Sequence, residues 1–451
     1  MKKRSDAWRA RDRAVLWHPF TQQRLWAEED FPVIERGEGC RLIDVDGRSY
    51  LDGVSSLWCN VHGHRSREID AALKKQLGKL SHATFLGLTN PPAVELAEEL
   101  VRIAPKGLTR VFYSDNGSTA VEIALKMAFQ YWQQNGRPER TTFVSLVEGY
   151  HGDTVGSMSA GGVELFHERF RPLLFPTLKA PTTYAYRCAK ASTLEECGAH
   201  CLDELGAILA SRGREVCGVV LEPLIQGAGG MIVQPPGFVK SVRELCTKHD
   251  VFLIVDEVMT GFGRTGTMFA CEREGVSPDL MALSKGLTGG YLPLAATLAT
   301  ERVYDGFLGS IAERRIFYHG HTYTGNPLAC AAALGALRAF AKETTLAKLP
   351  AKIAQFTDGL DGIALLPHVG EVRACGLIAG IELVRDRRTG EPYASEERIG
   401  HRVILEARAR GVLLRPLGNV IVLMPPLAIS RKEIAELLKA TRESIEAATG
   451  K

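Results

Sequence analysis

The chain has 451 residues, of which 45% are apolar and 24% are charged, and its formal net charge is +3 at pH 7. This length suffices for two or three domains, and this composition is typical of a water-soluble globular protein. The nearly balanced charge and the lack of any run of about 18 apolar residues exclude nucleic acid and membranes as expected partners.

The first 60 residues are predicted to be rich in loops. Their start, MKKRSDAWRARDRAVLW, is charged and has no apolar stretch after it, so we expect no secretory signal. Ten cysteines without a regular framework also favour a cytoplasmic protein with reduced thiols. Residues 16–22 (LWHPFTQ) and 46–64 (DGRSYLDGVSSLWCNVHGH) carry aromatic side chains that we expect to be exposed.

Between about residue 80 and residue 330, short apolar runs alternate with helical patterns. Four runs are typical of strands, at residues 110–115, 141–149, 216–224 and 251–258. Because these runs are continuously apolar, they indicate a parallel sheet covered on both faces. An apolar stripe predicts a helix over residues 118–134. The alternation predicts an α/β fold with an open, mostly parallel sheet flanked by helices.

Polar side chains stand at the end of each predicted strand. They are Ser114, Asp115, Asn116, Glu148, Tyr150, Glu222 and Asp256. Ligands of open α/β sheets bind beyond the carboxyl ends of the strands. The sequence therefore predicts a site built from these ends.

A cysteine cluster follows in the same part of the chain, made of Cys188, Cys197, His200 and Cys201. Metal binding is one interpretation, but the spacing matches none of the common zinc patterns. Cys197 and Cys201 also fit one face of a helix predicted over residues 193–210. We therefore favour ordinary thiols and expect no metal.

An aspartate and a lysine form a second candidate pair, between residues 256 and 285. Asp256 ends a predicted buried strand, and Lys285 follows 29 positions later between Ser284 and Gly286. A lysine is a nucleophile when burial or its neighbours lower its pKa, and it then forms imines. Pyridoxal phosphate uses such a lysine, together with a carboxylate that keeps its pyridine nitrogen protonated. Taken alone, Asp256 fits equally well as an aspartate that caps a turn. Lys285, taken alone, fits equally well as an ordinary surface lysine.

To bind pyridoxal phosphate, a protein needs a site for its phosphate group and a side chain that stacks on its pyridine ring. Gly117 and Ser118 stand where a strand turns into a helix, so their N–H groups and the helix dipole suit a phosphate. Residues 119–122 (TAVE) also fit a capping box, and a plain helix start explains the stretch locally just as well. Thr322 is a candidate for a second phosphate contact. Tyr150 is a candidate for stacking on the ring.

From about residue 335 the pattern changes to two helices, over residues 325–343 and 431–448, with a few strands between them. This arrangement predicts a smaller α+β domain. We predict an N-terminal segment (residues 1–75) that contributes to the small domain and the site, a large domain (76–334) and a C-terminal small domain (335–451).

Four motifs together carry a family resemblance over essentially the whole chain. They are residues 150–162 (YHGDTVGSMSAGG), 256–266 (DEVMTGFGRTG), 283–296 (LSKGLTGGYLPLAA) and 321–333 (HTYTGNPLACAAA). They resemble the class III, fold-type I pyridoxal-phosphate aminotransferases. Within that class, residues 16–22, 52–64 and 413–427 resemble the biotin-pathway branch, which aminates 8-amino-7-oxononanoate to 7,8-diaminononanoate. The resemblance implies pyridoxal 5′-phosphate as cofactor and a homodimer with its active sites at the subunit interface.

The same resemblance implies roles for individual residues. Lys285 matches the lysine that binds the cofactor covalently and acts as general base. Asp256 matches the partner of the pyridine nitrogen, and Tyr150 the tyrosine that stacks on the ring and lines the substrate. Gly117 and Ser118 match the phosphate site.

Further positions match the neighbouring-subunit segment and the substrate pocket. His321 and Thr322 match the segment that the neighbouring subunit lends to the phosphate site. Substrate-pocket positions are matched by Phe20, Trp58, Gly320 and Arg415. A guanidinium fork suits a carboxylate, which Arg415 would bind.

Departures from the branch concern the amino donor. Phe20 stands where adenosylmethionine-using members usually have tyrosine, and Leu57 precedes Trp58 where they have two tryptophans. Residues 320–322 read Gly-His-Thr instead of Gly-Pro-Thr. These features resemble members that use lysine, whereas most of the family uses adenosylmethionine, which we keep as the expected donor.

Alternatives are an aminotransferase of the same class for ornithine, 4-aminobutyrate or a polyamine, and a pyridoxal-phosphate mutase of the glutamate-1-semialdehyde type. A scaffold with a dead site is disfavoured because Lys285 and Asp256 are both present.

Overall fold

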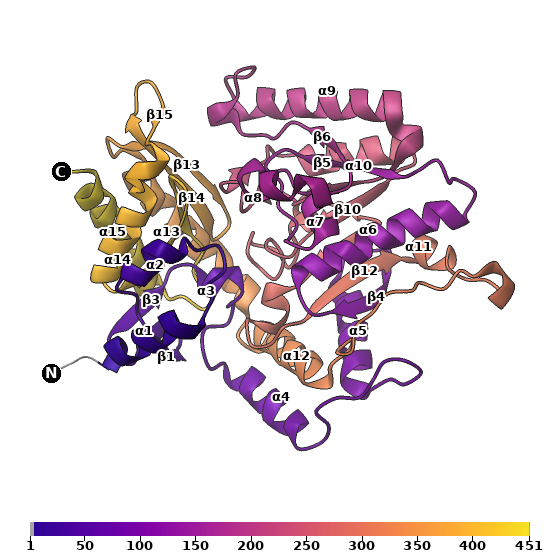
Figure 1. Ribbon diagram of the computed structural model, residues 1–451, viewed down its shortest axis with the longest axis horizontal. Coiled ribbons are helices and arrows are strands. Elements are labelled where there is room, and N and C mark those ends of the chain that lie inside the picture. The colour runs from indigo at the N-terminus through magenta and orange to yellow at the C-terminus, as the bar shows by residue number, and fades with distance from the viewer. Residues whose placement is uncertain (1–3, 451) are drawn as a thin grey trace.

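A computed structural model describes residues 4–450. The middle of the chain forms a region around a large sheet, and the N- and C-terminal parts form a second region beside it (Figure 1). Among the described residues, no helix is both long and apolar enough to cross a membrane.

The large sheet has seven strands in the order β4-β12-β11-β10-β7-β5-β6. Only β12 runs antiparallel to its neighbours. The bounds are β4 Leu108–Ser114, β5 Thr142–Leu146, β6 Leu178–Ala180, β7 Val216–Leu221, β10 Phe252–Asp256, β11 Leu280–Leu283 and β12 Ala295–Thr300. All four strands predicted from the sequence lie in this sheet. The predicted α/β class with a mostly parallel sheet is confirmed.

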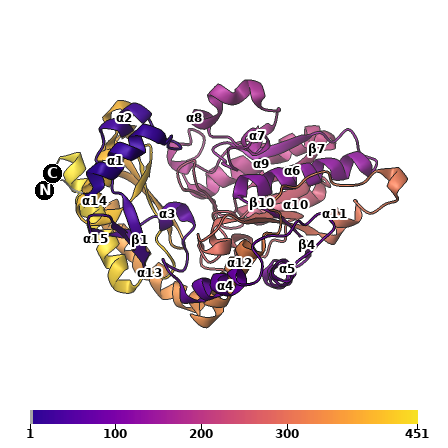
Figure 2. The same cartoon turned by 60° about the horizontal axis from the view of Figure 1, so that its bottom comes forward.

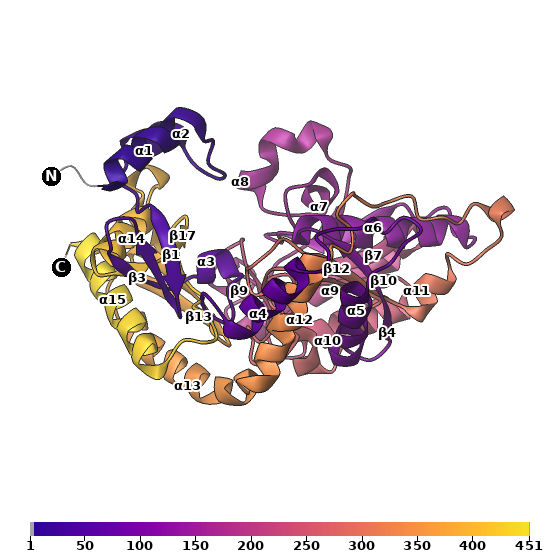
Figure 3. The same ribbon diagram turned by 90° about the horizontal axis from the view of Figure 1, so that it is seen from below.

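Helices cover both faces of this sheet, as its continuously apolar strands require. Helix α6 (Gly117–Gln134) packs on one face against alternate residues such as Phe252 and Ile254. Helices α9 (Leu194–Arg212) and α10 (Phe238–Lys248) pack on the other face, against Leu253 and Val255 among others. In Figure 3 the strands β10 and β12 lie between α6 and α10. Alternating side chains of each strand therefore fill two separate apolar layers.

Further elements of the large region are helices and two short strands. They are α4 Arg67–Leu77, α5 Pro91–Ile103, α7 Val155–Ala160, α8 Glu164–His167, β8 Ile225–Gln226, β9 Ile232–Val233, η5 Lys285–Thr288, α11 Glu301–Asp305 and α12 Pro327–Lys342.

The predicted capping box at residues 119–122 was wrong. Helix α6 begins earlier, at Gly117, and its N-cap is Asn116. The side chain of Asn116 accepts the N–H of Thr119 at 3.0 Å, and the Thr119 hydroxyl accepts the N–H of Asn116 at 3.3 Å. Gly117 and Ser118 are therefore the first two helical residues.

The C-terminal part holds an antiparallel sheet and three helices. The sheet contains β13 Val369–Cys375, β14 Ile378–Asp386, β15 Glu391–Pro392, β17 Arg415–Leu417 and β18 Val420–Leu423. The helices are α13 Thr345–Ala364, α14 Ile399–Ala409 and α15 Arg431–Thr449. The two helices predicted in this tail correspond to α12 and α15, whereas α13 and α14 were not expected. Pro350 inside α13 interrupts the helical signal in the sequence.

The N-terminal part is more regular than the loop-rich segment we expected. It holds α1 Arg4–Val15, α2 Gln23–Glu28, β1 Ile34–Glu38, β2 Arg41–Asp44 and β3 Ser49–Asp52. Strand β3 also pairs in parallel with β16 (Val412–Leu413), so the two ends of the chain share one sheet. Figure 2 shows α2 near α14, and Glu29, which directly follows α2, pairs with Arg408 of α14 at 3.1 Å.

Of the cysteine cluster, Cys197 and Cys201 lie on the buried face of α9, whereas Cys188 precedes the helix and is half-buried. The sulfur atoms of Cys197 and Cys201 lie 3.6 Å and 3.1 Å from the carbonyl oxygen of Thr182. Within residues 4–450, no group of three or more His, Cys, Asp and Glu side chains is arranged to hold a metal ion. The geometry fits buried thiols that pack in the core.

Candidate active site

A cavity of about 680 Å³ opens at the carboxyl ends of the large sheet. Polar side chains that follow five strands line it: Asp115 after β4, Tyr150 after β5, Glu222 after β7, Asp256 at the end of β10 and Lys285 after β11. The expectation that the strand ends build a site therefore agrees with the geometry. Six of the predicted site residues line this cavity: Trp58, Gly117, Ser118, Tyr150, Asp256 and Lys285.

Lys285 is the cationic side chain at the floor of the cavity. It begins the short helix η5 with a left-handed backbone (φ 48°), and Ser284 separates it from the end of β11. Burial lowers the pKa of its amine, although the nearby carboxylates of Asp256 and Glu222 act in the opposite direction. A lowered pKa increases the neutral fraction of the amine, which is the form that can attack a carbonyl or take up a proton.

Asp256 faces the same cavity and is 5% exposed. One of its carboxylate oxygens lies 2.9 Å from Nδ1 of His151, and the other accepts the N–H of Val258 at 3.1 Å. Nε2 of His151 is buried and has no hydrogen-bond partner among residues 4–450. His151, which directly follows Tyr150 in the chain, was not among the site residues predicted from the sequence.

Glu222 is a second group whose role the sequence did not indicate beyond its position at a strand end. Its carboxyl oxygens accept the N–H of Tyr150 at 3.0 Å and the N–H of Gly227 at 2.8 Å. Its pKa is raised to about 7, mainly by burial. The charge of His151 lowers this pKa, whereas the charge of Asp256 raises it. Glu222 thus fixes the backbone of Tyr150.

The start of α6 lies at one side of the cavity. The N–H groups of Gly117 and Ser118 have no acceptor within the described chain and stand at the positive end of an 18-residue helix. The hydroxyl of Ser118 lies 2.9 Å from that of Thr154 and also accepts the Thr154 N–H at 2.9 Å. At Gly152 (φ 118°), a Cβ would lie 2.2 Å from the Ser118 hydroxyl oxygen. Only glycine permits this loop to approach the helix so closely, and the free N–H groups suit a phosphate.

Tyr150 connects the cavity to the N-terminal segment. Its hydroxyl donates to a carboxylate oxygen of Asp153 at 2.7 Å, and its ring meets Phe166 edge-on at 6.1 Å. The ring of Phe20 also meets Phe166 edge-on, with 5.5 Å between the ring centroids, and Phe20 is 61% exposed. Phe20 does not line the main cavity but lines a second, mostly apolar cavity of about 560 Å³, and Asp153 lines both. Phe20 therefore lies beside the site.

Arg415 begins β17 and is half-buried, and it is not among the residues that line the main cavity. Burial lowers the pKa of its guanidinium, while Tyr150 raises it, so the two side chains are near each other. The guanidinium makes no ion pair or hydrogen bond with any residue between 4 and 450. A half-buried cation without a partner suits an anionic ligand.

The segment from Gly320 to Thr322 lies apart from Lys285 in this single chain. Gly320 and Thr322 are exposed and do not line the cavity. His321 is closer, with its Nε2 3.9 Å from a carboxylate oxygen of the cavity-lining Asp115. One chain alone therefore does not bring these predicted phosphate and substrate contacts together with Lys285.

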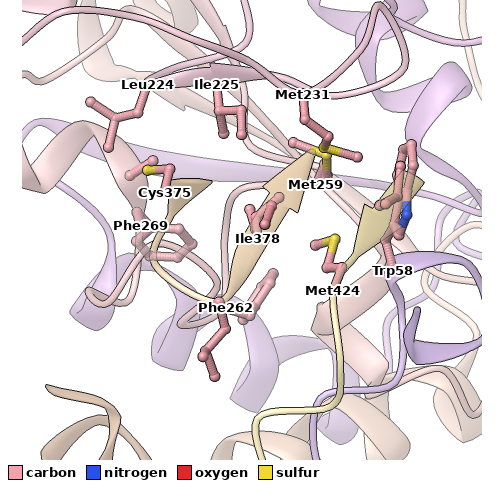
Figure 4. Close-up of a cluster of buried hydrophobic side chains, with 14 of the residues drawn as sticks. Trp58, Leu224, Ile225, Met231, Met259, Phe262, Phe269, Cys375, Ile378 and Met424 are labelled. Atoms are coloured by element: carbon pink, nitrogen blue, oxygen red, sulfur yellow. The ribbon is translucent and has the colours of Figure 1, made fainter. Parts of the chain in front are cut away.

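Trp58 contradicts the expectation of exposed aromatics in residues 46–64, since it is 5% exposed and Tyr50 is 2% exposed. Trp58 lies at one end of a buried apolar cluster, beside Met424 (Figure 4). Its ring centroid is 5.0 Å from Nζ of Lys285. Trp58 ends a turn, α3 (Ser55–Trp58), in which every residue has a positive φ. Left-handed backbone costs roughly 1–2 kcal/mol per non-glycine residue, so this turn is strained.

Comparison with known proteins places this fold and cavity in one family. The aminotransferase class-III model matches residues 25–445, so the chain belongs to the class III aminotransferase family. It is 59% identical to the adenosylmethionine-8-amino-7-oxononanoate aminotransferase of Geobacter sulfurreducens, over 97% of each chain.

Solved structures agree with this assignment. The enzyme of the same name from Methanocaldococcus jannaschii matches with a TM-score of 0.93 and 47% identity, over 98% of this chain and 99% of that chain. The omega transaminase from Pseudomonas jessenii, in complex with PMP, matches with a TM-score of 0.92 and 33% identity, over 98% of both chains. The predicted fold-type I architecture is thus confirmed.

Proposed function

We propose that the protein transfers an amino group from S-adenosyl-L-methionine to 8-amino-7-oxononanoate, giving 7,8-diaminononanoate for biotin synthesis, with pyridoxal 5′-phosphate as its cofactor. The observation that carries the proposal is the cavity that joins Lys285, Asp256 and the free start of α6. The names of the relatives from G. sulfurreducens and M. jannaschii support the choice of substrates. We also propose that it works in the cytoplasm as a homodimer, in which Gly320, His321 and Thr322 serve the partner's site.

The cavity fits this cofactor group by group. The N–H groups of Gly117 and Ser118 would bind the phosphate, and Asp256 would pair with the protonated pyridine nitrogen. Lys285 would bind the cofactor covalently, and Tyr150 would lie against its ring. When bound, pyridoxal phosphate supplies an electron sink for the substrate carbon that bears the amino group.

The residues of the chain supply positioning and proton transfer. With the cofactor and the donor bound, Nζ of Lys285 would take a proton from the donor carbon and would return one during the opposite half of the reaction. Its lowered pKa favours the neutral, proton-accepting form. The bond from His151 orients the carboxylate of Asp256. Trp58 covers Lys285 and limits the access of water, which strengthens charge interactions in the cavity.

Replacing Arg415 with alanine is expected to raise the KM for 8-amino-7-oxononanoate far more than it changes kcat. The expected loss of substrate-binding free energy is about 1.5–3 kcal/mol, because a charge-assisted pair with the substrate carboxylate disappears. Steady-state kinetics at saturating donor measure it. Arg388→Ala, an exposed arginine of the same sheet region, is the matched control. An unchanged KM with a lower melting temperature would show that Arg415 is only structural.

The donor is tested by offering adenosylmethionine or lysine separately with 8-amino-7-oxononanoate and measuring 7,8-diaminononanoate. We expect turnover with adenosylmethionine and, as the alternative donor, measurable turnover with lysine. Phe20 lacks the hydroxyl of a tyrosine, and a hydrogen bond donated by that hydroxyl would contribute roughly 0.5–1.5 kcal/mol. Leu57 likewise offers no aromatic plane for a purine or a sulfonium. Phe20→Tyr should therefore raise kcat/KM for adenosylmethionine relative to lysine.

The outcomes of this experiment separate the candidates. If the parent enzyme rejects lysine and Phe20→Tyr changes nothing, Phe20 is only a packing residue. Turnover of ornithine, 4-aminobutyrate or a polyamine without any turnover of 8-amino-7-oxononanoate would favour the second candidate function. The similarity to omega transaminases at 32–34% identity is the observation behind that candidate.

A further inference from the structure

The turn Ser55–Trp58 connects the N-terminal sheet to the cavity wall. Trp58 lines the cavity, and its ring centroid lies 5.0 Å from Nζ of Lys285. The indole N–H of Trp58 is buried and has no acceptor within residues 4–450. No polar bond of the side chain therefore holds the ring in place, and its position depends on the backbone that carries it.

That backbone is held in a conformation which its residues disfavour. Ser55, Ser56, Leu57 and Trp58 have φ values of 51°, 49°, 76° and 68°, and none of them is glycine. Such residues avoid the left-handed region because Cβ crowds the following carbonyl oxygen. Contacts with the surrounding structure must therefore stabilise the turn. One is the bond of 2.6 Å from the Ser55 hydroxyl to the carbonyl oxygen of Met424.

Asp52 makes the most extensive contact with the turn. It ends β3 and is 1% exposed. One carboxylate oxygen accepts the N–H of Ser56 at 3.0 Å and that of Val54 at 3.3 Å, and the other accepts the Ser56 hydroxyl at 2.8 Å. Nε2 of His64 lies 3.3 Å from the second oxygen. Hydrogen bonds to a buried, charged carboxylate are stronger than those between neutral groups.

We propose that Asp52 is a positioning residue, whose carboxylate holds the left-handed turn Ser55–Trp58 and thereby fixes the indole of Trp58 against Lys285 in the wall of the substrate cavity. Asp52 itself does not line that cavity. The proposal rests on the proposed function for the identity of the substrate. Without the carboxylate, the turn relaxes toward negative φ and Trp58 leaves its place above Lys285.

Asp52→Asn in the full-length holoenzyme tests the proposal. Asparagine keeps the size of the side chain but loses the charge and presents an N–H₂ group to one of the present donors. Subtracting the fluorescence spectrum of Trp58→Phe from that of the parent isolates the emission of Trp58. The same subtraction in the Asp52→Asn background should give emission at longer wavelength and stronger quenching by acrylamide. Unchanged emission and quenching would overturn the proposal.

Kinetics provide the second measurement. We expect Asp52→Asn to raise the KM for 8-amino-7-oxononanoate about tenfold and to change kcat less. In the Trp58→Phe background the same substitution should raise KM less than twofold, because residues that act through each other are not additive. Additive effects would overturn the proposal. If the parent does not aminate 8-amino-7-oxononanoate at all, the proposed function fails, while the fluorescence result still decides the role of Asp52.

Asp44→Asn is the matched control. Asp44 ends the neighbouring strand β2, is 5% exposed, and accepts the N–H of Arg48 and the hydroxyl of Tyr50, both at 2.8 Å. It holds a turn of the same sheet that is not connected to Trp58. We expect Asp44→Asn to lower the melting temperature but to leave the emission of Trp58 and the KM unchanged. An equal rise in KM for both variants would mean that lost stability explains the effect, and the proposal would fail.

Discussion

Lys285→Ala is expected to abolish covalent attachment of the cofactor and to reduce amino transfer on the order of 10²–10⁴-fold, the usual contribution of a positioned acid–base group. The purified parent should be yellow and the variant should lack the absorption of the protonated imine. Borohydride reduction followed by peptide mass analysis should find the cofactor on the peptide that contains Lys285.

Lys179 is the matched control for this experiment. The residue as a whole is exposed, but burial of its amine lowers the pKa of that amine to about 8. However, Nζ of Lys179 donates to the hydroxyl of Ser145 at 2.8 Å and to the carbonyl oxygen of Ala160 at 3.0 Å, and it does not line the cavity. Lys179→Met should destabilise the protein without removing the label. A label on any lysine other than Lys285 would contradict the site assignment.

Asp256→Asn should leave the cofactor bound but slow both half-reactions more than tenfold, which corresponds to at least about 1.4 kcal/mol of activation free energy. A neutral amide cannot keep the pyridine nitrogen protonated, so the electron sink weakens. Stopped-flow absorbance measures each half-reaction separately. Loss of less than tenfold would show that Asp256 is not the partner of the nitrogen.

The control for Asp256 is another aspartate of the same sheet. Asp279 accepts the N–H of Leu253 at 2.8 Å and pairs with Arg243 at 2.6 Å, but it precedes β11 and lies away from the cavity. Asp279→Asn should lower stability and leave the half-reaction rates close to those of the parent. Equal losses in both variants would indicate a general effect of unfolding.

The sequence predicted the parts of the site that lie where strands end, because strand-end positions and short motifs are local signals. Lys285, Asp256 and Gly117 all belong to this group. It did not predict the bond between His151 and Asp256, whose partners are 105 residues apart along the chain. The role of Glu222 as acceptor for two N–H groups likewise requires the fold.

Two other features had no sequence signal of their own. A positive φ is expected at glycine, so four such residues in a row at Ser55–Trp58 could not be foreseen. As a consequence, Trp58 was expected to be exposed and is buried. In the small region, Pro350 concealed a helix, whereas the regular helices α6 and α15 were predicted to within one residue at each end.

The N-terminal and C-terminal parts of the chain share one sheet, and this has a consequence for folding during synthesis on the ribosome. Strand β3 ends at Asp52, and its partner β16 begins at Val412, about 360 residues later. At about 5–20 residues per second, a ribosome needs roughly 20–70 s to make that intervening chain. During this time one edge of β3 has no partner and is open to association with other chains. The N-terminal segment, and with it the tryptophan of the cavity wall, can reach its final place only when synthesis is nearly complete.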